Sequence, residues 1–248
     1  MRIDVLFGSS ALTQPLVSAR VVAVLDVLRA SSSIAAALTN GAKHIVPLDS
    51  IDEVISRAKA FARGEVLLAG ERKMAAIAGF DLGNSPRAFT RETVEGKTVL
   101  FTTTNGTGTL VAVQGARDVI VASYVNFSVV TALLSTALRG GTDVTLLCAG
   151  RDRSFSLEDA ACAGRYVHVL AQRHEGVQRN DAAAAAEIID EQYGEAVDRV
   201  FADSEHGRAL AAAGYADDLE ACAAIDSFPV VPIYQDRQIT KLGPDRER

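Results

Sequence analysis

Six short apolar runs, rich in β-branched residues and bounded by Gly or charged residues, constrain the fold most strongly. Continuous apolar runs of this length are typical of strands that are covered on both faces, as in a parallel or mixed sheet. We therefore predict strands at residues 21–26, 44–48, 65–70, 97–103, 118–123 and 143–150.

Helical patterns lie between these runs. Ser50 and Glu53 have the spacing of a capping box, and apolar residues then recur at helical spacing through residues 51–63. We expect one face of this helix to pack on the sheet. Because strands and helices alternate, the sequence predicts the α/β class, with a layered α/β/α arrangement and a mixed, largely parallel sheet.

Two segments share one pattern, in which a strand is followed by a polar loop, a helix and a Gly-Ala pair. They begin with the strands at 21–26 and 97–103, and each is interpreted as a βαβ unit whose helix ends at the Gly. The identities between them are few, so internal duplication stays open. We predict a single domain over residues 1–248, with lobes at about 1–95 and 96–248 as a finer hypothesis.

The chain changes character after about residue 180, where it becomes Ala-rich and helical. Asn180 or Asp181 is the expected cap of the first helix there. This helical segment is followed by "FPVVPIYQ", which we predict to be a last edge strand, because Pro229 and Pro232 cannot donate to a sheet ladder.

Composition excludes several classes of protein. The formal net charge is -6 and 48% of the residues are hydrophobic, so no electrostatic attraction to nucleic acid or anionic lipid is expected. The sequence has no basic leader with an apolar core and no apolar run of the ~18 residues that span a bilayer. We expect a cytoplasmic protein whose three cysteines are buried thiols; a homo-oligomer is left open.

Polar residues that follow the predicted strands are the first candidates for a site, because open α/β sheets bind ligands outside the carboxyl ends of their strands. Carboxylates, arginines and hydroxyl groups all occur at these positions. They are Asp26, Arg29 and Ser31 to Ser33; Glu71 and Arg72; Thr102 to Thr104, Asn105, Gly106 and Thr107; and Arg151, Arg153, Ser154, Glu158 and Asp159.

This inventory indicates metal-assisted chemistry on a polyanion. Backbone N–H groups, hydroxyl groups and an Arg fork hold phosphate, sulfonate or carboxylate groups. Carboxylates beside such an anion would repel it unless a hard cation lay between them, and Mg²⁺ is bound by one or two carboxylates together with water and substrate oxygens. The combination favours Mg²⁺-assisted chemistry on a phosphorylated substrate.

Each feature also has a plainer interpretation. The serines after Arg29 can cap a helix, and Glu158 with Asp159 can complement the dipole of a helix that begins near Ser156. Glu71 and Arg72 can form an exposed ion pair of little energetic worth. The Asn105-Gly106 pair can form a tight turn with positive φ. Their common location after strands favours the functional interpretation.

Familiar phosphate motifs fail. A dinucleotide fingerprint at residues 106–111 has Val111 in place of its third Gly, and "GKT" at 96–98 precedes a strand and lacks the upstream Gly of a phosphate loop. An aspartyl phosphatase would have an acid where Leu28 stands, and a cysteine phosphatase an Arg where Ser154 stands. No G-x-S-x-G elbow occurs. Among the histidines, His206 in "SEHGR" is the one to follow, since the others lie in strand or helix patterns.

Long blocks of the sequence resemble one family. The blocks "DVLRASSSIAAAL", "LLAGER", "GFDLGNSP", "TTTNGT", "CAG…FSLEDAACAG" and "SEHGRAL" occur in the order seen in the 2-phosphosulfolactate phosphatase (ComB-like) family, over residues 20–235. The resemblance implies a Mg²⁺-dependent phosphatase that releases phosphate from 2-phospho-3-sulfolactate, a step of coenzyme M biosynthesis. It also implies an α/β fold that the common phosphatases do not share.

Residue roles follow from the family blocks. The acids that match them are Asp26, Glu71, Asp81 and the pair Glu158 and Asp159. We predict catalytic roles for Asp26, Glu71 and Asp159, and a metal site formed by Asp26, Glu71, Glu158 and Asp159; Asp81 can instead hold its loop as an Asx-turn. We predict that the small polyanionic substrate is bound by Arg29, Ser31, Ser32, Arg72, Thr103, Thr104, Asn105 and Gly106.

Two departures from the family pattern affect the substrate more than the reaction. Gly108 stands where an Arg is expected, and "ERKMA" lacks the glycine pair expected after "ER". The leading hypothesis is thus a phosphoric monoester hydrolase acting on 2-phospho-3-sulfolactate or a similar small phosphorylated acid. A non-catalytic binder or sensor of a polyanionic metabolite is the alternative, and a nucleotide-dependent oxidoreductase is a third.

Overall fold

A single mixed sheet runs through the protein. The computed structural model describes residues 1–62, 64–113, 115–152 and 154–243, and within them eleven strands are joined in one sheet. Most neighbouring strands are parallel, as the sequence predicts. In order across the sheet the strands are β5 (Ala75–Ala76), β4 (Val66–Arg72), β6 (Thr98–Thr102), β3 (His44–Pro47), β11 (Gln238–Lys241), β10 (Pro232–Gln235), β7 (Asp118–Ala122), β2 (Val21–Leu25), β8 (Val144–Cys148), β1 (Arg2–Leu6) and β9 (Gln178–Arg179).

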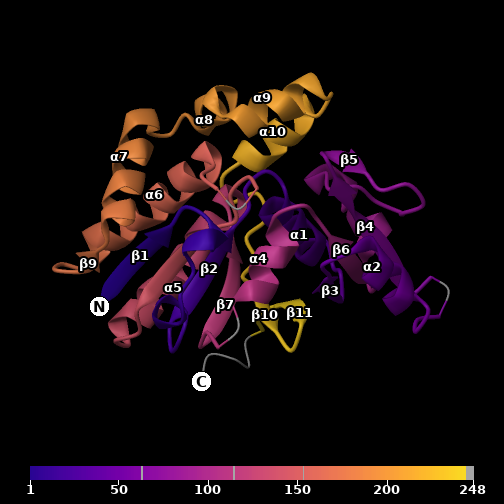
Figure 1. Ribbon diagram of the computed structural model, residues 1–248, viewed down its shortest axis with the longest axis horizontal. Coiled ribbons are helices and arrows are strands. Elements are labelled where there is room, and N and C mark those ends of the chain that lie inside the picture. Colours follow the sequence, from indigo (N-terminus) through magenta and orange to yellow (C-terminus); the bar gives the residue numbers. More distant parts are fainter. Residues whose placement is uncertain (63, 114, 153, 244–248) are drawn as a thin grey trace.

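The sheet consists of two parallel units joined by an antiparallel hairpin. The larger unit contains β7, β2, β8, β1 and β9, and the smaller unit contains β3, β6 and β4, with β5 antiparallel at its edge. The β10–β11 hairpin lies between them, with β10 antiparallel to β7 and β11 antiparallel to β3 (Figure 1). Each unit contains strands from both sides of residue 95.

The prediction of an edge strand at "FPVVPIYQ" is wrong, because β10 is central in the sheet. Pro229 precedes the strand, and Pro232 is its first residue. Pairing of β10 with β7 is recorded from Ile233, opposite Ile120. Proline is tolerated in a sheet at the first position of a strand, where its missing N–H interrupts no central ladder. The two prolines therefore mark the beginning of the strand.

The turn of this hairpin gives a stability prediction. Asp236 and Arg237 form its two-residue loop with φ values of 52° and 61°, and a turn of this kind favours Gly at the second position. We expect Arg237→Gly to raise the free energy of unfolding by about 1 kcal/mol, measured by chemical denaturation. Arg237→Ala is the matched control, since it also removes the exposed ion pair with Glu53; equal stability of the two variants would contradict the prediction.

The chain crosses between the two units through the segments predicted as βαβ units. Helix α1 (Ala30–Thr39) connects β2 with β3, and α4 (Gly106–Ala112) connects β6 with β7. The order of elements is as predicted, but β2 does not pair with β3, nor β6 with β7, because the hairpin lies between the units. Apolar periodicity identifies an element and leaves its pairing partner open.

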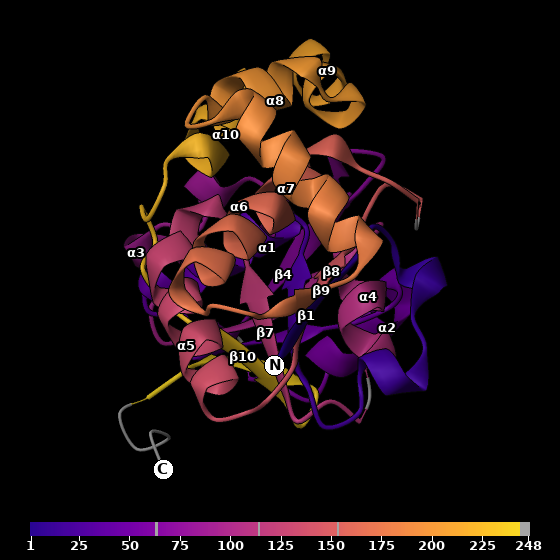
Figure 2. The ribbon, with the colours of Figure 1, turned by 90° about the vertical axis from the view of Figure 1, so that its left-hand side faces the viewer.

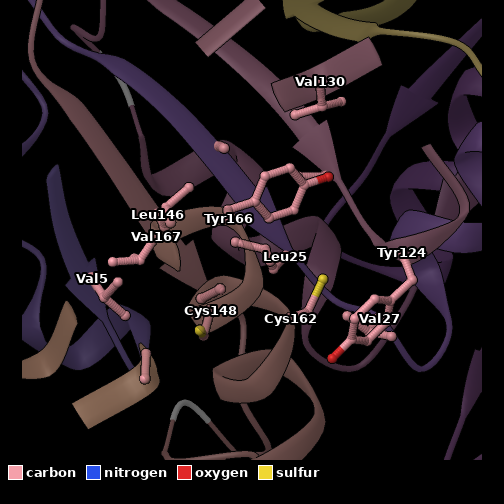
Figure 3. Packing of buried hydrophobic residues seen from close by; sticks show 14 of the residues in the cluster. Val5, Leu25, Val27, Tyr124, Val130, Leu146, Cys148, Cys162, Tyr166 and Val167 are labelled. Atoms are coloured by element: carbon pink, nitrogen blue, oxygen red, sulfur yellow. The ribbon is translucent and has the colours of Figure 1, made fainter. Parts of the chain in front are cut away.

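Helices cover both faces of the sheet, which confirms the layered fold. Alternate residues of β2 point to opposite faces. Val21, Ala23 and Leu25 belong to the apolar cluster with α5 (Phe127–Arg139) and α6 (Leu157–Arg173), whereas Val22 and Val24 belong to the cluster with α1. In Figure 2 the strands lie between α5 on one side and α4 with α2 (Ile51–Ala58) on the other. Figure 3 shows Leu25 and Leu146 among Tyr166, Val167 and other residues of the first cluster.

Two helix caps that the sequence predicts are present in the structure. Ser50 Oγ accepts the Glu53 N–H at 3.1 Å, and Asn180 Oδ1 accepts the Ala183 N–H at 2.9 Å. Within the described ranges no helix has the length and apolar character needed to cross a bilayer. Besides α1 and α4 the helices are α2 (Ile51–Ala58), α3 (Arg91–Val94), α5 (Phe127–Arg139), α6 (Leu157–Arg173), α7 (Asp181–Tyr193), α8 (Val197–Asp203), α9 (Glu205–Ala212) and α10 (Ala216–Ala223).

Candidate functional site

One cavity lies at the carboxyl ends of β2, β4, β6 and β8. Its volume of about 220 Å³ suits a small metabolite better than a nucleotide cofactor. The position is the one expected for a ligand in an open α/β sheet, where connections diverge to different parts of the sheet. The cavity is lined by Asp26, Leu28, Arg29, Glu71, Lys73, Met74, Asn84, Thr104, Asn105, Arg151, Asp152 and His206.

Asp26 directly follows β2 and is only 8% exposed. Burial is the main cause that raises the pKa of its carboxyl group to about 6; the charges of Glu71 and Glu158 raise the pKa further, while His206 and the Ala30 N–H lower it. That N–H lies 3.4 Å from Asp26 Oδ1. A carboxyl group that changes its protonation near neutral pH is suited to acid–base work or to binding a cation.

Glu71 lies in β4 and is held by two backbone donors. Its Oε1 accepts the Thr104 N–H at 2.7 Å, and its Oε2 accepts the Met74 N–H at 2.9 Å. The interpretation of Glu71 and Arg72 as an exposed ion pair is wrong, because Glu71 is 7% exposed and the Arg72 guanidinium binds the Glu71 carbonyl oxygen and Thr102 Oγ1. Arg72 does not line the cavity.

The serines after Arg29 form the turn behind the cavity wall. Ser31 Oγ accepts the Asp26 N–H at 2.9 Å, Ser32 Oγ donates to the Val27 carbonyl, and Ser33 Oγ donates to the Asn84 carbonyl. All three are buried, and none lines the cavity. They do not cap α1 either, since Arg29 is its N-cap residue.

The loop after β6 is held by reciprocal threonine contacts. The Thr103 N–H donates to Thr107 Oγ1 at 3.2 Å, and the Thr107 N–H donates to Thr103 Oγ1 at 3.3 Å. These bonds leave Thr104 and Asn105 on the cavity wall, where Asn105 Oδ1 accepts the Asp152 N–H at 3.2 Å. Thr103 itself lies behind the wall.

Gly106 is the first residue of α4 and lies directly against Asp26. A Cβ atom at this position would be 2.6 Å from Asp26 Oδ2 and 2.9 Å from Ala30 Cβ. The interpretation of Asn105 and Gly106 as a turn with positive φ is wrong, because neither residue has a positive φ. Gly is needed here for space, since only a residue without a side chain permits this approach.

Asp159 connects the loops that follow β2 and β8. Its Oδ1 accepts the Val27 N–H at 2.9 Å, and its Oδ2 accepts the Gly150 N–H at 3.0 Å. Burial, with the nearby charges of Glu158 and Asp26, raises the pKa of the Asp159 carboxyl group well above its usual range. The side chain does not line the cavity, so its contacts shape the loop that carries Asp26.

Glu158 lies behind His206, on the first turn of α6. Its Oε1 is 3.2 Å from His206 Nδ1, and Glu158 is 2% exposed. Burial raises the pKa of Glu158, but the hydrogen bond and charge of His206 outweigh it, so the pKa is lowered. The pair holds the imidazole on the cavity wall. The sequence pattern singled out His206 among the histidines but predicted no role for it.

Four more residues of the wall had no predicted catalytic, metal or substrate role. Asn84 is 6% exposed, and its Oδ1 has no hydrogen-bond partner among the described residues, which points to a ligand. Lys73 and Met74 form the β4–β5 turn with φ values of 50° and 70°, where the family pattern led us to expect a glycine pair. Arg151 lines the cavity; Arg153, another candidate, lies outside the described residues.

The acids of the cavity do not form a compact ligand cluster. In the described part of the chain, one group of three side chains places its possible ligand atoms within 4.8 Å of one another. It consists of His168, Glu187 and Glu191, on α6 and α7. Asp26 and Glu71 share the cavity wall instead. Two carboxylates are a donor set of the kind that Mg²⁺ takes in proteins, where water and substrate oxygens complete its shell.

The sequence of the whole cavity region matches a known family. A sequence model described as 2-phosphosulpholactate phosphatase matches residues 9–237. The chain belongs to this family. The resemblance noted in the sequence blocks is thereby confirmed, and residues 9–237 of the family match include every residue that lines the cavity.

Relatives in the family span nearly the same length. A protein of Clostridium botulinum (strain Eklund 17B / Type B) is 33% identical over 98% of this chain and 100% of its own. Proteins of Caldanaerobacter subterraneus and Thermotoga maritima are each 37% identical, over 85% and 87% of this chain and 86% and 89% of their own. All three are named as probable 2-phosphosulfolactate phosphatases.

Proposed function

We propose that this protein is a Mg²⁺-dependent phosphatase that hydrolyses the phosphate monoester of 2-phospho-3-sulfolactate or a similar small phosphorylated acid. The observation that carries the proposal is the presence of two buried carboxylates, Asp26 and Glu71, in one small cavity with the buried cation Arg29. Membership of the family supports the reaction class, and the names of the relatives support the substrate.

The chain's own residues account for binding and orientation. Asp26 and Glu71 would hold Mg²⁺, which when bound neutralises phosphate charge and lowers the pKa of water. Arg29 offers N–H donors to an anionic oxygen of the substrate. Thr104 and Met74 keep Glu71 in place through their backbone N–H groups. These residues come from separate loops, so binding depends on the fold that brings them together.

Proton transfer to the leaving group is assigned to His206. Its Nδ1 faces Glu158, so Nε2 is the ring nitrogen that can hold a proton beside the substrate. A carboxylate behind an imidazole fixes its orientation and tautomer. When the P–O bond breaks, the leaving alkoxide takes the proton from Nε2. Water supplies the new oxygen on phosphorus, and the proton that this water gives up restores the protonated imidazole.

The test is phosphate release from 2-phospho-3-sulfolactate, measured colorimetrically with Mg²⁺ and with excess EDTA. We expect turnover with Mg²⁺ and at least a hundredfold loss in EDTA, restored by added Mg²⁺. A panel of small phosphorylated acids lacking the sulfonate or the carboxylate would define the substrate. Full velocity in EDTA would contradict the metal requirement.

The binding alternative has a distinct result. Thermal stabilisation of the protein by 2-phospho-3-sulfolactate, without release of phosphate from it or from any acid of the panel, would identify a sensor. Such an outcome would remove the phosphatase proposal while leaving the cavity as a polyanion site.

A further inference from the structure

The helical segment that follows α7 carries a buried acid that reaches the cavity only through another residue. Asp218 on α10 is 3% exposed and does not line the cavity. Its Oδ2 lies 2.6 Å from Arg29 Nη1, and its Oδ1 accepts a hydrogen bond from Ser85 Oγ at 2.6 Å. Both carboxylate oxygens of Asp218 therefore have a partner: one binds Arg29 on the cavity wall, and the other binds Ser85 in the loop before residues 86–88.

Arg29 is held on three sides. Besides Asp218, the Met74 carbonyl oxygen accepts a hydrogen bond from Nη2 at 2.9 Å, and the guanidinium carbon lies 4.2 Å from the centre of the Tyr215 ring. A guanidinium group has five N–H donors. Two are used in these bonds, which leaves three without a partner among the described residues, on a side chain that lines the cavity.

The buried Arg29–Asp218 ion pair is not well explained by a contribution to folding stability. Taking an Arg and an Asp out of water costs free energy that their attraction only partly offsets, so an apolar pair of similar volume is often as stable. A planar guanidinium fixed in one orientation, in contrast, matches the paired oxygens of a phosphate or carboxylate. The fixed orientation also reduces the side-chain entropy that is lost when an anion binds.

We propose that Asp218 and Tyr215 are positioning residues, which hold the Arg29 guanidinium so that its free N–H donors face an anionic group of the substrate. The helical segment thereby takes part in substrate binding without touching the substrate. This inference deepens the proposed function and rests on it for the identity of the anion.

The decisive comparison is between Asp218→Asn and Asp217→Asn. Asp217 is the adjacent residue of α10 and forms an exposed ion pair with Arg87. Its substitution therefore removes an ion pair between α10 and residues 86–88, next to the Ser85 contact of Asp218, without affecting Arg29. With 2-phospho-3-sulfolactate as substrate, we expect Asp218→Asn to raise KM at least about tenfold with kcat nearly unchanged. Asp217→Asn should leave both constants at the wild-type values.

A double-mutant cycle tests whether Asp218 acts through Arg29. Arg29→Lys keeps the charge and loses the fork. If Asp218 works by orienting that fork, the double variant Arg29→Lys/Asp218→Asn should have the same KM as Arg29→Lys alone. Multiplication of the two single effects, or equal KM values for Asp218→Asn and Asp217→Asn, would overturn the proposal.

A second pair of variants avoids burying an unpaired charge. Tyr215→Leu removes the ring beneath the guanidinium, and Tyr215→Phe keeps it. We expect Tyr215→Leu to raise KM about threefold to tenfold and Tyr215→Phe to preserve the wild-type KM. If Asp218→Asn fails to fold, this pair decides: a KM raised equally in both variants, or in neither, would overturn the role of the ring.

Binding of inorganic phosphate separates this inference from the proposed function, because it needs no turnover. Calorimetry should show phosphate binding about tenfold weaker for Asp218→Asn than for wild type and for Asp217→Asn. This result in a protein without phosphatase activity would support the positioning role and refute the function. Turnover with unchanged phosphate binding in Asp218→Asn would do the reverse, and a wild-type protein that neither binds nor releases phosphate would contradict both.

Discussion

Replacing Asp26 with Asn is expected to abolish phosphate release and, in the metal-free protein, to increase stability. Loss of the carboxylate should lower kcat by about a thousandfold or more, because Asn provides neither a negative charge for a cation nor a base. The fold should survive, since Asn keeps an oxygen that can accept the Ala30 N–H, as Asp26 Oδ1 does now.

The stability gain follows from the raised pKa of Asp26. The pKa is about 6 in the folded chain, above the ordinary 3.8, so the folded state holds the proton more tightly than the unfolded state does. The resulting contribution to stability is fully present below about pH 4 and is lost as the pH rises through 6. At 1.36 kcal/mol per pH unit, the ionised group costs the folded state about 3 kcal/mol at pH 7.5. Asn does not titrate and avoids this cost.

Chemical denaturation in EDTA at pH 7.5 and pH 4 checks this account. Asp26→Asn should be more stable than wild type at pH 7.5, with the difference vanishing at pH 4. Asp52→Asn, an exposed substitution on α2, should change neither activity nor stability in this manner. Retained turnover in Asp26→Asn would remove Asp26 from the mechanism, and a pH-independent stability difference would refute the titration argument.

A methyl group at position 106 is expected to reduce kcat/KM about a hundredfold. In Gly106→Ala the new Cβ would lie 2.6 Å from Asp26 Oδ2 and 2.9 Å from Ala30 Cβ. Both distances are shorter than van der Waals contact, and the Ala30 methyl is fixed by the backbone of α1. The Asp26 carboxylate or the first turn of α4 must therefore move, and either shift changes the wall of the cavity.

Gly108→Ala is the matched control on the same helix. A Cβ at position 108 has no heavy atom within 4 Å, and Ala stabilises a helix interior by up to about 1 kcal/mol relative to Gly. We expect this variant to keep wild-type kcat/KM and to melt at a slightly higher temperature. Equal activity of Gly106→Ala and Gly108→Ala would show that the close approach to Asp26 has no functional consequence.

The sequence predicts those residues of the cavity wall that stand at the ends of strands. Asp26, Glu71 and Thr104 stand at the carboxyl ends of apolar runs, and the geometry of α/β sheets brings such ends together. The same rule placed Ser31 and Thr103 with them, although both lie behind the wall. Position along the chain indicates the loop, whereas the direction of each side chain depends on the packing of the turn.

Buried ion pairs between residues that are far apart in the sequence produce no local sequence pattern, so they could not be predicted. The ion pair of Arg29 with Asp218 joins residues 189 positions apart. Strand β1 is not among the predicted elements. Asp is a residue type that is depleted in strands, yet Asp4 of β1 is buried and paired with Arg2 and Arg20. In both cases a charge is tolerated in the interior because a partner comes from another segment of the chain, Asp218 for Arg29 and Arg20 for Asp4. Apolar periodicity does not record such a contact.

Because the β10–β11 hairpin is central in the sheet, the sheet can be completed only after the last strands have been synthesised. Strands β3 and β7 leave the ribosome long before residues 232–241, which later separate them in the sheet. Until then each presents a free edge to which the edge strand of another nascent chain can add. Translation arrested before residue 232 would therefore yield an aggregation-prone product instead of a smaller working enzyme, and a crowded polysome would place the greatest demand on chaperones at this late stage.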